Sequence, residues 1–206
     1  FVAEIILTDE LPNGSGFVRH LFNNFEEVLS DTIAPPSEKL YLKLIHDGKH
    51  SNSCKDSCYD CLKVYRNMNY HSLLDWRLAL SMIRLMNDET FVCGTDRNFD
   101  YVELKHWLKD AILLRDSFLQ SFGYKHKSDL NGLPLIRWGQ GMKNIIVIVH
   151  PFWNVSNLNY EENWLARTFT SLKKEVNGSG GSLSIIDTFN LHRRPGWCYE
   201  KLVIRE

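Results

Sequence analysis

Hydrophobic residues form three short, nearly continuous runs, at residues 2–7, 144–149 and 183–186. Runs of this length without polar alternation are typical of strands that are buried on both faces. The first run resembles the other two in character, and it could therefore share a sheet with them. The pattern predicts a small sheet with a well-buried centre.

Apolar residues spaced three and four positions apart predict four amphipathic helices. The first begins near Val18 and ends before Ala34-Pro35-Pro36, because a residue that precedes proline avoids the helical region. The other three are expected at residues 72–87, 101–122 and 161–176.

The order strand 144–149, helix 161–176 and strand 183–186 predicts a parallel βαβ unit. The glycine- and serine-rich segment 177–182 is expected to be a flexible loop. The fold class is therefore α/β. A helix-rich, zinc-binding part, residues 1–90, surrounds a short strand, and a parallel βαβ-like part, residues 91–206, follows and could continue the same domain.

The composition limits the classes of function. The chain has 206 residues, 44% of them hydrophobic, and a net charge of −1. It therefore lacks the global basic field of a free-standing nucleic-acid binder, so contact with DNA would need a local patch. No apolar run reaches the ~18–20 residues that span a bilayer, which predicts no membrane partner. Clustered cysteines without secretory features indicate a reducing, cytoplasmic location.

Three of the five cysteines fall within eight positions, at Cys54, Cys58 and Cys61. Thiolates at such short spacings favour a tetrahedral Zn²⁺ site over disulfides, although three buried, reduced cysteines are the alternative. We expect His71 to be the fourth ligand because it precedes a helix and could fold back. His50 is the alternative fourth ligand. A site with four protein ligands is closed, and hence structural.

Four residues are candidates for contact with nucleic-acid phosphates. Ser15 lies in a Gly-Ser-Gly turn that opens a helix, where backbone N–H groups can hold a phosphate. Arg77 could reach DNA or make a buried ion pair, and Arg193 and Arg194 follow the last predicted strand. A structural role is the alternative for each residue.

A hydrolase or nuclease in the C-terminal part is the alternative function. His150 and Asp187 each follow a predicted parallel strand, at the edge where α/β proteins place their sites. A His/Asp pair can perform acid–base chemistry, and His192 lies nearby in sequence. Strand-end residues that pack and cap are the structural alternative.

Several strings resemble a known family. Residues 9–17, Asp-Glu-Leu-Pro-Asn-Gly-Ser-Gly-Phe, resemble the loop that opens the C-terminal zinc-binding domain of MrfA-type DEAD-box helicases. The cysteine cluster, followed by Leu74-Asp75, resembles the same domain. The strings Ser57–Leu62 and Leu74–Leu80, with His71, are similar to the DrmB-type proteins of DISARM anti-phage defence. The resemblance covers residues 3–86, and beyond them it depends mainly on His150-Pro-Phe-Trp153.

The resemblance implies a non-catalytic zinc-binding accessory domain that works beside a superfamily-2 helicase on DNA. ATPase activity would then lie in another domain or in the partner. The family has a fourth cysteine about six residues after its C-x-x-C pair, where this chain has Asn67. A protein-interaction platform without DNA contact is the third hypothesis, since the near-zero net charge suits it equally well.

Overall fold

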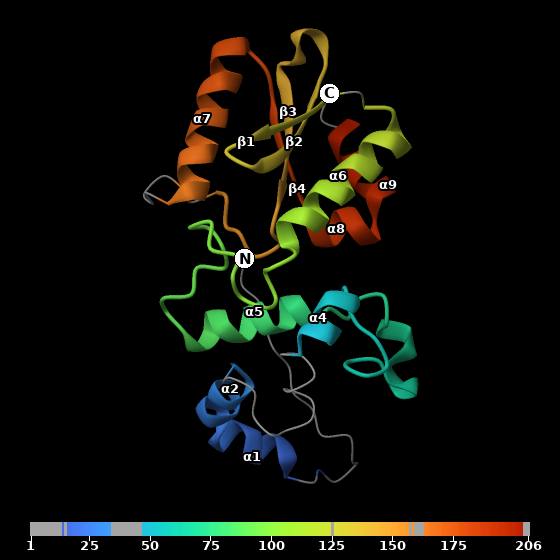
Figure 1. Ribbon diagram of the computed structural model, residues 1–206, viewed down its shortest axis with the longest axis vertical. Helices are drawn as coiled ribbons and strands as arrows, with labels where there is room; N and C mark the ends of the chain where they lie inside the picture. The colour runs from blue at the N-terminus through green and yellow to red at the C-terminus, as the bar shows by residue number, and fades with distance from the viewer. Residues whose placement is uncertain are drawn as a thin grey trace.

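The computed structural model describes residues 14, 16–33, 47–124, 126–156, 158 and 163–203. A mixed sheet with helices on both faces forms one end of the molecule, and a group of helices and loops that contains Cys54, Cys58 and Cys61 forms the other (Figure 1). The expected α/β class is confirmed. The boundary at residue 90 stays a prediction, and so does the strand at residues 2–7, which lies outside the described residues.

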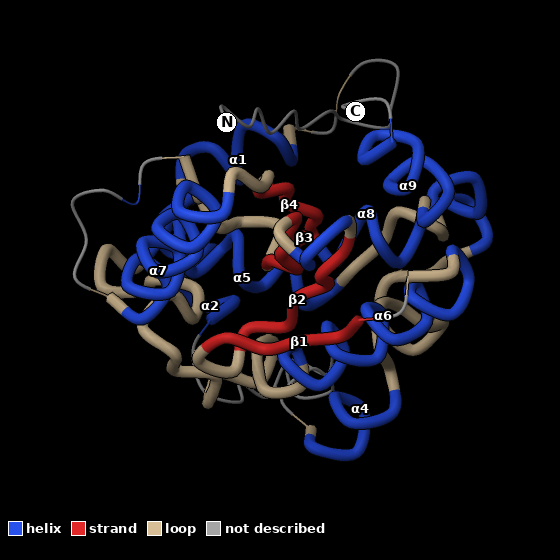
Figure 2. The backbone as a smooth tube through the Cα atoms, turned by 90° about the horizontal axis from the view of Figure 1, so that it is seen from above, coloured by secondary structure: helices blue, strands red, loops and turns tan. Residues whose placement is uncertain are grey.

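Four strands form the sheet in the order β1-β2-β3-β4. Their bounds are His126–Leu130 for β1, Leu133–Trp138 for β2, Asn144–Val149 for β3 and Leu183–Asp187 for β4. β1, β2 and β3 are antiparallel neighbours, and β3 pairs with β4 in parallel. Figure 2 shows the strands in this order through the centre of the fold.

The parallel β3–β4 pair confirms the predicted βαβ unit, with α7 (Trp164–Ser179) as the crossover helix. α7 covers one face of the sheet, and α6 (Trp107–Phe122), α8 (Thr188–Arg193) and α9 (Pro195–Val203) cover the other (Figures 1 and 2). The central strand β3 is consequently buried from Ile145 to Val149. Burial on both faces explains its continuous apolar run.

The hairpin β1–β2 was not predicted from the sequence. Its two-residue loop, Asn131-Gly132, has φ of 53° and 87°, as a type I′ turn requires. An Asn-Gly pair before Leu133-Pro-Leu-Ile was the available signal, but the polar residues of β1 obscured the alternation. β1 is an edge strand of the sheet and lies largely exposed, which permits this composition.

The expectation of a loop at 177–182 was wrong for residues 177–179, which belong to α7. α7 continues through Asn177 and Gly178 to Ser179, and the chain then turns at Gly180, where φ is 64°. A Cβ on Gly181 would lie 1.9 Å from the carbonyl oxygen of Lys143, so the two backbones are in direct contact there. Both the backbone N–H and the hydroxyl of Ser182 donate to Asn144 Oδ1, each at 3.0 Å. Close packing therefore orders this turn.

The other end of the molecule is built from short helices: α1 (Phe17–Asn23), α2 (Phe25–Ile33), α4 (Gly48–Ser53), α5 (Trp76–Asn87) and the 3₁₀ helix η1 (Tyr65–Tyr70). The single helix expected from Val18 is thus two helices separated at Asn24. α5 begins four residues later than expected because Asp75 caps it, accepting from the N–H groups of Arg77 and Leu78 at 3.1 Å.

Two further details complete the fold. α6 begins at Trp107, because residues 101–106 form turns in place of the expected first helical turn. A short 3₁₀ helix η2 (Gln140–Met142) connects β2 to β3. None of the helices described combines the length and the apolar character needed to cross a membrane.

Gly178 and Gly181, on either side of the turn at Gly180 that ends α7, make a matched pair for a stability test. We expect Gly181→Ala to lower the free energy of unfolding by about 2 kcal/mol, because the new methyl overpacks against Lys143. Gly178→Ala, in open space within α7, should raise it by about 0.5 kcal/mol through lower unfolded-chain entropy. Urea unfolding measures both changes. Equal effects of the two substitutions would contradict the packed turn.

Candidate metal centre

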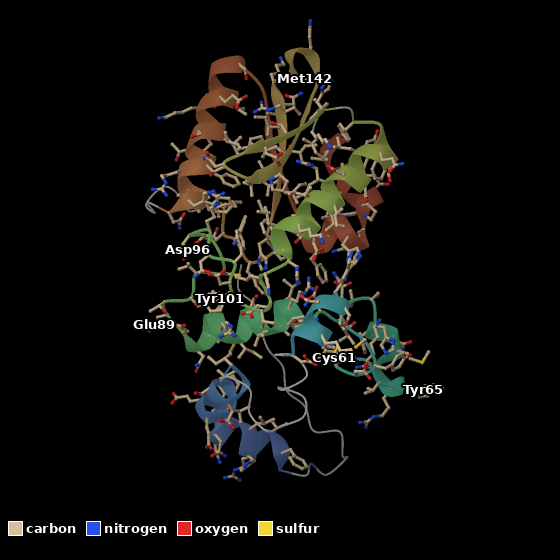
Figure 3. The ribbon with its side chains drawn as sticks, in the orientation of Figure 1. Cys61, Tyr65, Glu89, Asp96, Tyr101 and Met142 are labelled. Carbon is tan, nitrogen blue, oxygen red and sulfur yellow. The ribbon has the colours of Figure 1, made fainter. Side chains whose placement is uncertain are left out.

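The structure brings together four side chains with metal-ligating atoms: His50, Cys54, Cys58 and Cys61. One ligand atom of each lies within 4.8 Å of the others, and this group could hold a metal ion. His50 and Cys54 are buried, and the other two cysteines are half-buried. Figure 3 marks Cys61 in this region, beside α4.

The distances fit a tetrahedral site. The Cys58 and Cys61 sulfurs are 3.7 Å apart, those of Cys54 and Cys61 are 3.9 Å apart, and Cys58 Sγ lies 3.5 Å from His50 Nε2. Zinc bonds of about 2.3 Å to sulfur and about 2.05 Å to nitrogen give tetrahedral edges of about 3.8 Å and about 3.6 Å. All of the cysteines are free thiols. These three donor pairs therefore have the spacing expected around a bound tetrahedral cation, and all four donor atoms lie within 4.8 Å of one another.

Two local structures present the ligands. His50 lies in the helix α4 and Cys54 follows this helix as its C-cap residue, where the Cys54 N–H donates to the His50 carbonyl at 2.8 Å. The second is a tight turn in which the Cys61 N–H donates to the Cys58 carbonyl at 3.2 Å. The Cys58 N–H in turn donates to Cys61 Sγ at 3.1 Å.

Electrostatics make a cation favourable here. Burial raises the pKa of the Cys54 thiol to about 12, and the neighbouring Cys61 and Cys58 add to the increase. Without a cation the Cys54 thiol holds its proton. A bound metal ion reverses this preference because its charge stabilises the thiolates, so binding would release protons.

His50 is positioned by packing. Its ring lies against Trp76, with 5.9 Å between ring centroids, and its Nε2 faces the sulfurs. Its Nδ1 is buried without a hydrogen-bond partner in the described part of the chain. Because Nε2 faces the cysteine sulfurs, it is the nitrogen positioned to bind a metal.

His71, the fourth ligand that we expected, is not in the group. Its Nε2 lies 2.9 Å from Asn67 Oδ1 and 3.1 Å from the Val64 carbonyl oxygen, and its ring packs edge-on against Tyr59. The turns of η1 hold it in this separate contact. The alternative, His50, occupies the position beside the cysteines. Its spacing of four residues before Cys54 was the signal, because one helical turn places both on the same face.

Residues 50–61 carry the four candidate ligands, and we call this segment the metal-binding loop. Contacts with α5 and α6 anchor it. The indole N–H of Trp76 donates to the Cys54 carbonyl at 3.1 Å, and its backbone N–H donates to the Asp56 carbonyl at 2.9 Å. Arg77 donates to the Ser51 carbonyl at 3.1 Å and pairs with Asp110 of α6 at 2.9 Å. Arg77, a candidate for DNA contact, is therefore engaged in a structural ion pair.

The other candidates for nucleic-acid contact differ in their surroundings. Arg193 donates to the Ser72 and Leu74 carbonyls and lies 3.4 Å from Asp75, so it joins α8 to the start of α5. Arg194 is exposed, and its guanidinium lies 5.0 Å from the centre of the Trp197 ring. Ser15 lies outside the described residues.

His150 and Asp187 do not converge on one cavity. His150 is buried and lines a cavity beside α6, together with His192. Asp187 caps α8, accepting from the Asn190 N–H at 2.8 Å, and it lines a different hollow. Asp187 pairs in register with Val149, so it is not directly opposite His150, which is the next residue along the chain. This geometry does not support the hydrolase hypothesis based on these two residues.

Comparisons of the chain with models of protein families, with curated proteins and with solved structures found no match.

The metal affinities of two variants distinguish His50 from His71 as the fourth ligand. We expect His50→Ala to weaken metal binding by more than about 100-fold. Removal of a direct ligand lowers metal affinity more than removal of a residue that only contacts a ligand. His71→Ala should leave binding within a few-fold of the original protein. Competition with a chromophoric chelator measures both affinities. Weaker binding after the His71 substitution alone would contradict the assignment.

Proposed function

We propose that the four residues bind one zinc ion and that this zinc is structural. The observation that carries the proposal is the His50–Cys54–Cys58–Cys61 group, whose spacing suits tetrahedral S and N ligands. A tetrahedral site of three thiolates and one imidazole is typical of zinc. With four protein ligands the ion has no open position for a substrate or water.

The ion would stabilise the folded conformation of the loop that carries the cysteines, which has only a small hydrophobic core. The buried cluster at this end contains only Cys54, Trp76 and Leu80 among the described residues, with partly buried neighbours such as Leu62 and Val102. Binding free energy then becomes folding free energy for the loop.

We further propose that the chain is an accessory module of a helicase-linked anti-phage defence protein. The support is the resemblance of the loop at residues 9–17, the cysteine spacing and the Leu74-Asp75 helix start to MrfA-type and DrmB-type sequences. In this proposal the ATPase motor lies elsewhere, and the module contacts DNA, the helicase or both.

Exposed apolar side chains close to the cysteines in the sequence suit such a contact. They are large side chains from residues 59–73, between Cys58 and the start of α5: Tyr59, Val64, Tyr65, Met68, Tyr70 and Leu73. Tyr65 is 84% exposed, and Figure 3 shows it at the outer edge of the molecule. Apolar patches rimmed by polar residues commonly mark interaction sites.

Removal of the metal tests the structural role. We expect chelation to release about one zinc per chain and to increase hydrogen exchange at residues 48–75. Amides in β3, which lies in the separate main core, should stay protected. Exchange followed by mass spectrometry measures both regions. Unchanged protection of the loop after complete zinc loss would contradict a structural zinc.

Salt dependence tests the contact with DNA. We expect duplex affinity to fall with salt, with a log–log slope of about −0.9 for each phosphate neutralised. Arg194→Ala should reduce the slope by about 1 if this exposed side chain contacts a phosphate. Lys174→Ala is the matched loss of charge, on the exposed side of α7. Salt-independent or undetectable binding would favour a protein-interaction platform.

A further inference from the structure

An open groove of about 470 Å³ lies between the metal-binding loop and α8. Cys54 and Cys58 are among the residues that line it. Cys54 is 8% exposed, whereas Cys58 is half-buried and therefore the more accessible of the two. Hydrogen peroxide is only slightly larger than water, which occupies about 30 Å³ in the liquid, so a groove of this size admits it. Small solutes thus reach the metal centre most readily beside Cys58.

Basic side chains outnumber acidic ones in this groove. Its charged or ionisable lining residues, apart from the cysteines, are Lys55, Asp56, Lys63, His71, His192 and Arg193. Asp56 faces His192 at 3.5 Å, and Arg193 lies 3.4 Å from Asp75. Neither lysine has an ion-pair partner in the part of the chain that the structure describes. Cationic, partly exposed surroundings of this kind are typical of cysteines that react as thiolates.

Cys58 and Cys61 have the geometry from which a disulfide can form. The hydrogen bond from the Cys61 N–H to the Cys58 carbonyl closes a β-turn, and such a turn keeps its end Cα atoms within about 7 Å of each other. Disulfides usually join residues whose Cα atoms are about 4.4–6.8 Å apart. The two sulfurs already lie 3.7 Å from each other. A local adjustment of the turn is therefore sufficient to join them.

The other cysteines are less available for oxidation. Cys54 Sγ lies 3.9 Å from Cys61 Sγ, but Cys54 is buried, and hydrogen bonds to His50 and Trp76 hold its backbone on both sides. Cys93 and Cys198 are each 2% exposed and belong to separate buried clusters. Exposure and spacing together therefore single out the pair Cys58 and Cys61.

We propose that Cys58 and Cys61 are a site of reversible oxidation by a hydroperoxide, and that their disulfide releases the zinc. This proposal rests on the structural zinc proposed above, because zinc keeps both side chains as nucleophilic thiolates. The Cys58 thiolate attacks one peroxide oxygen, the O–O bond breaks, and a sulfenic acid and a hydroxide form. The Cys61 thiolate then attacks the Cys58 sulfur, the S–S bond forms and a second hydroxide leaves. Two thiolates lose two electrons in total, and one peroxide is reduced to two hydroxides.

Oxidation would remove two of the four zinc ligands. His50 and Cys54 alone cannot complete a tetrahedral structural site, so the ion would leave. The metal-binding loop would then lose the support of the ion, and the groove that it forms with α8 would change shape. Reduction by a thiol would restore the ligands, because disulfides exchange with thiolates.

Peroxide treatment of the intact, zinc-loaded chain tests this proposal. We expect release of about one zinc for each peroxide consumed, because one disulfide removes two ligands. A chromophoric chelator measures the zinc, and reduction with dithiothreitol followed by added zinc should restore the site. A chain that holds no zinc before treatment would overturn both this proposal and the structural zinc. Zinc retained in excess peroxide would overturn this proposal alone.

Peptide mapping identifies the oxidised pair. Trypsin cleaves after lysine, which places Cys58 and Cys61 in one peptide, residues 56–63, and Cys54 in another. After peroxide treatment and alkylation in denaturant, we expect a disulfide within the peptide 56–63 and alkylated thiols at the other cysteines. A disulfide that includes Cys54, or sulfinic acids without any disulfide, would overturn the assignment.

Two substitutions, each of which removes one thiol, provide a matched comparison. Cys61→His keeps four zinc ligands but removes the partner of Cys58, so zinc release by peroxide should slow by about 10-fold or more. Cys198→Ser removes a buried thiol outside the centre and should leave the rate unchanged. Zinc affinity measured before oxidation shows whether Cys61→His is loaded. Release from the loaded Cys61→His variant at the original rate would overturn the proposal.

Discussion

The end of the molecule that contains α4 and η1 depends on one constraint, the close packing of four ligand atoms. Three cysteine sulfurs and one imidazole nitrogen lie there within 4.8 Å of one another. Burial disfavours an ionised thiol in the absence of a cation, and it raises the pKa of Cys54 to about 12. As protonated thiols the three cysteines would give the loop only weak hydrogen bonds. A bound tetrahedral cation would instead form one strong bond to each of the four ligand atoms.

The metal-binding loop also joins the two ends of the molecule. Its Asp56 faces His192 at 3.5 Å and Arg193 at 4.0 Å, so the segment between two ligands contacts α8. Arg77 extends from α5 to both α4 and α6. Arg77 and Arg193, two of the three arginines that suggested DNA contact in the sequence, thus connect these elements, whereas Arg194 is exposed. Because the metal-binding loop forms one wall of the groove beside α8, order in the loop and the shape of the groove are physically linked.

The features that could be predicted from the sequence are those with a local signal. The run at 144–149 and the cysteine spacing each specify their structure within a few residues. The choice of His50 over His71 needed the contact of His71 with Asn67, which spacing does not reveal. The ordered turn at 177–182 depends on the approach of Gly181 to Lys143, a long-range contact that composition alone cannot show.

X-ray absorption at the zinc edge tests the central claim, the identity of the centre, most directly. We expect a first shell of three sulfurs at about 2.3 Å and one nitrogen at about 2.05 Å from the zinc. The nitrogen signal should change in His50→Ala and stay unchanged in His71→Ala. A protein without zinc, or a first shell dominated by oxygen and nitrogen, would contradict it.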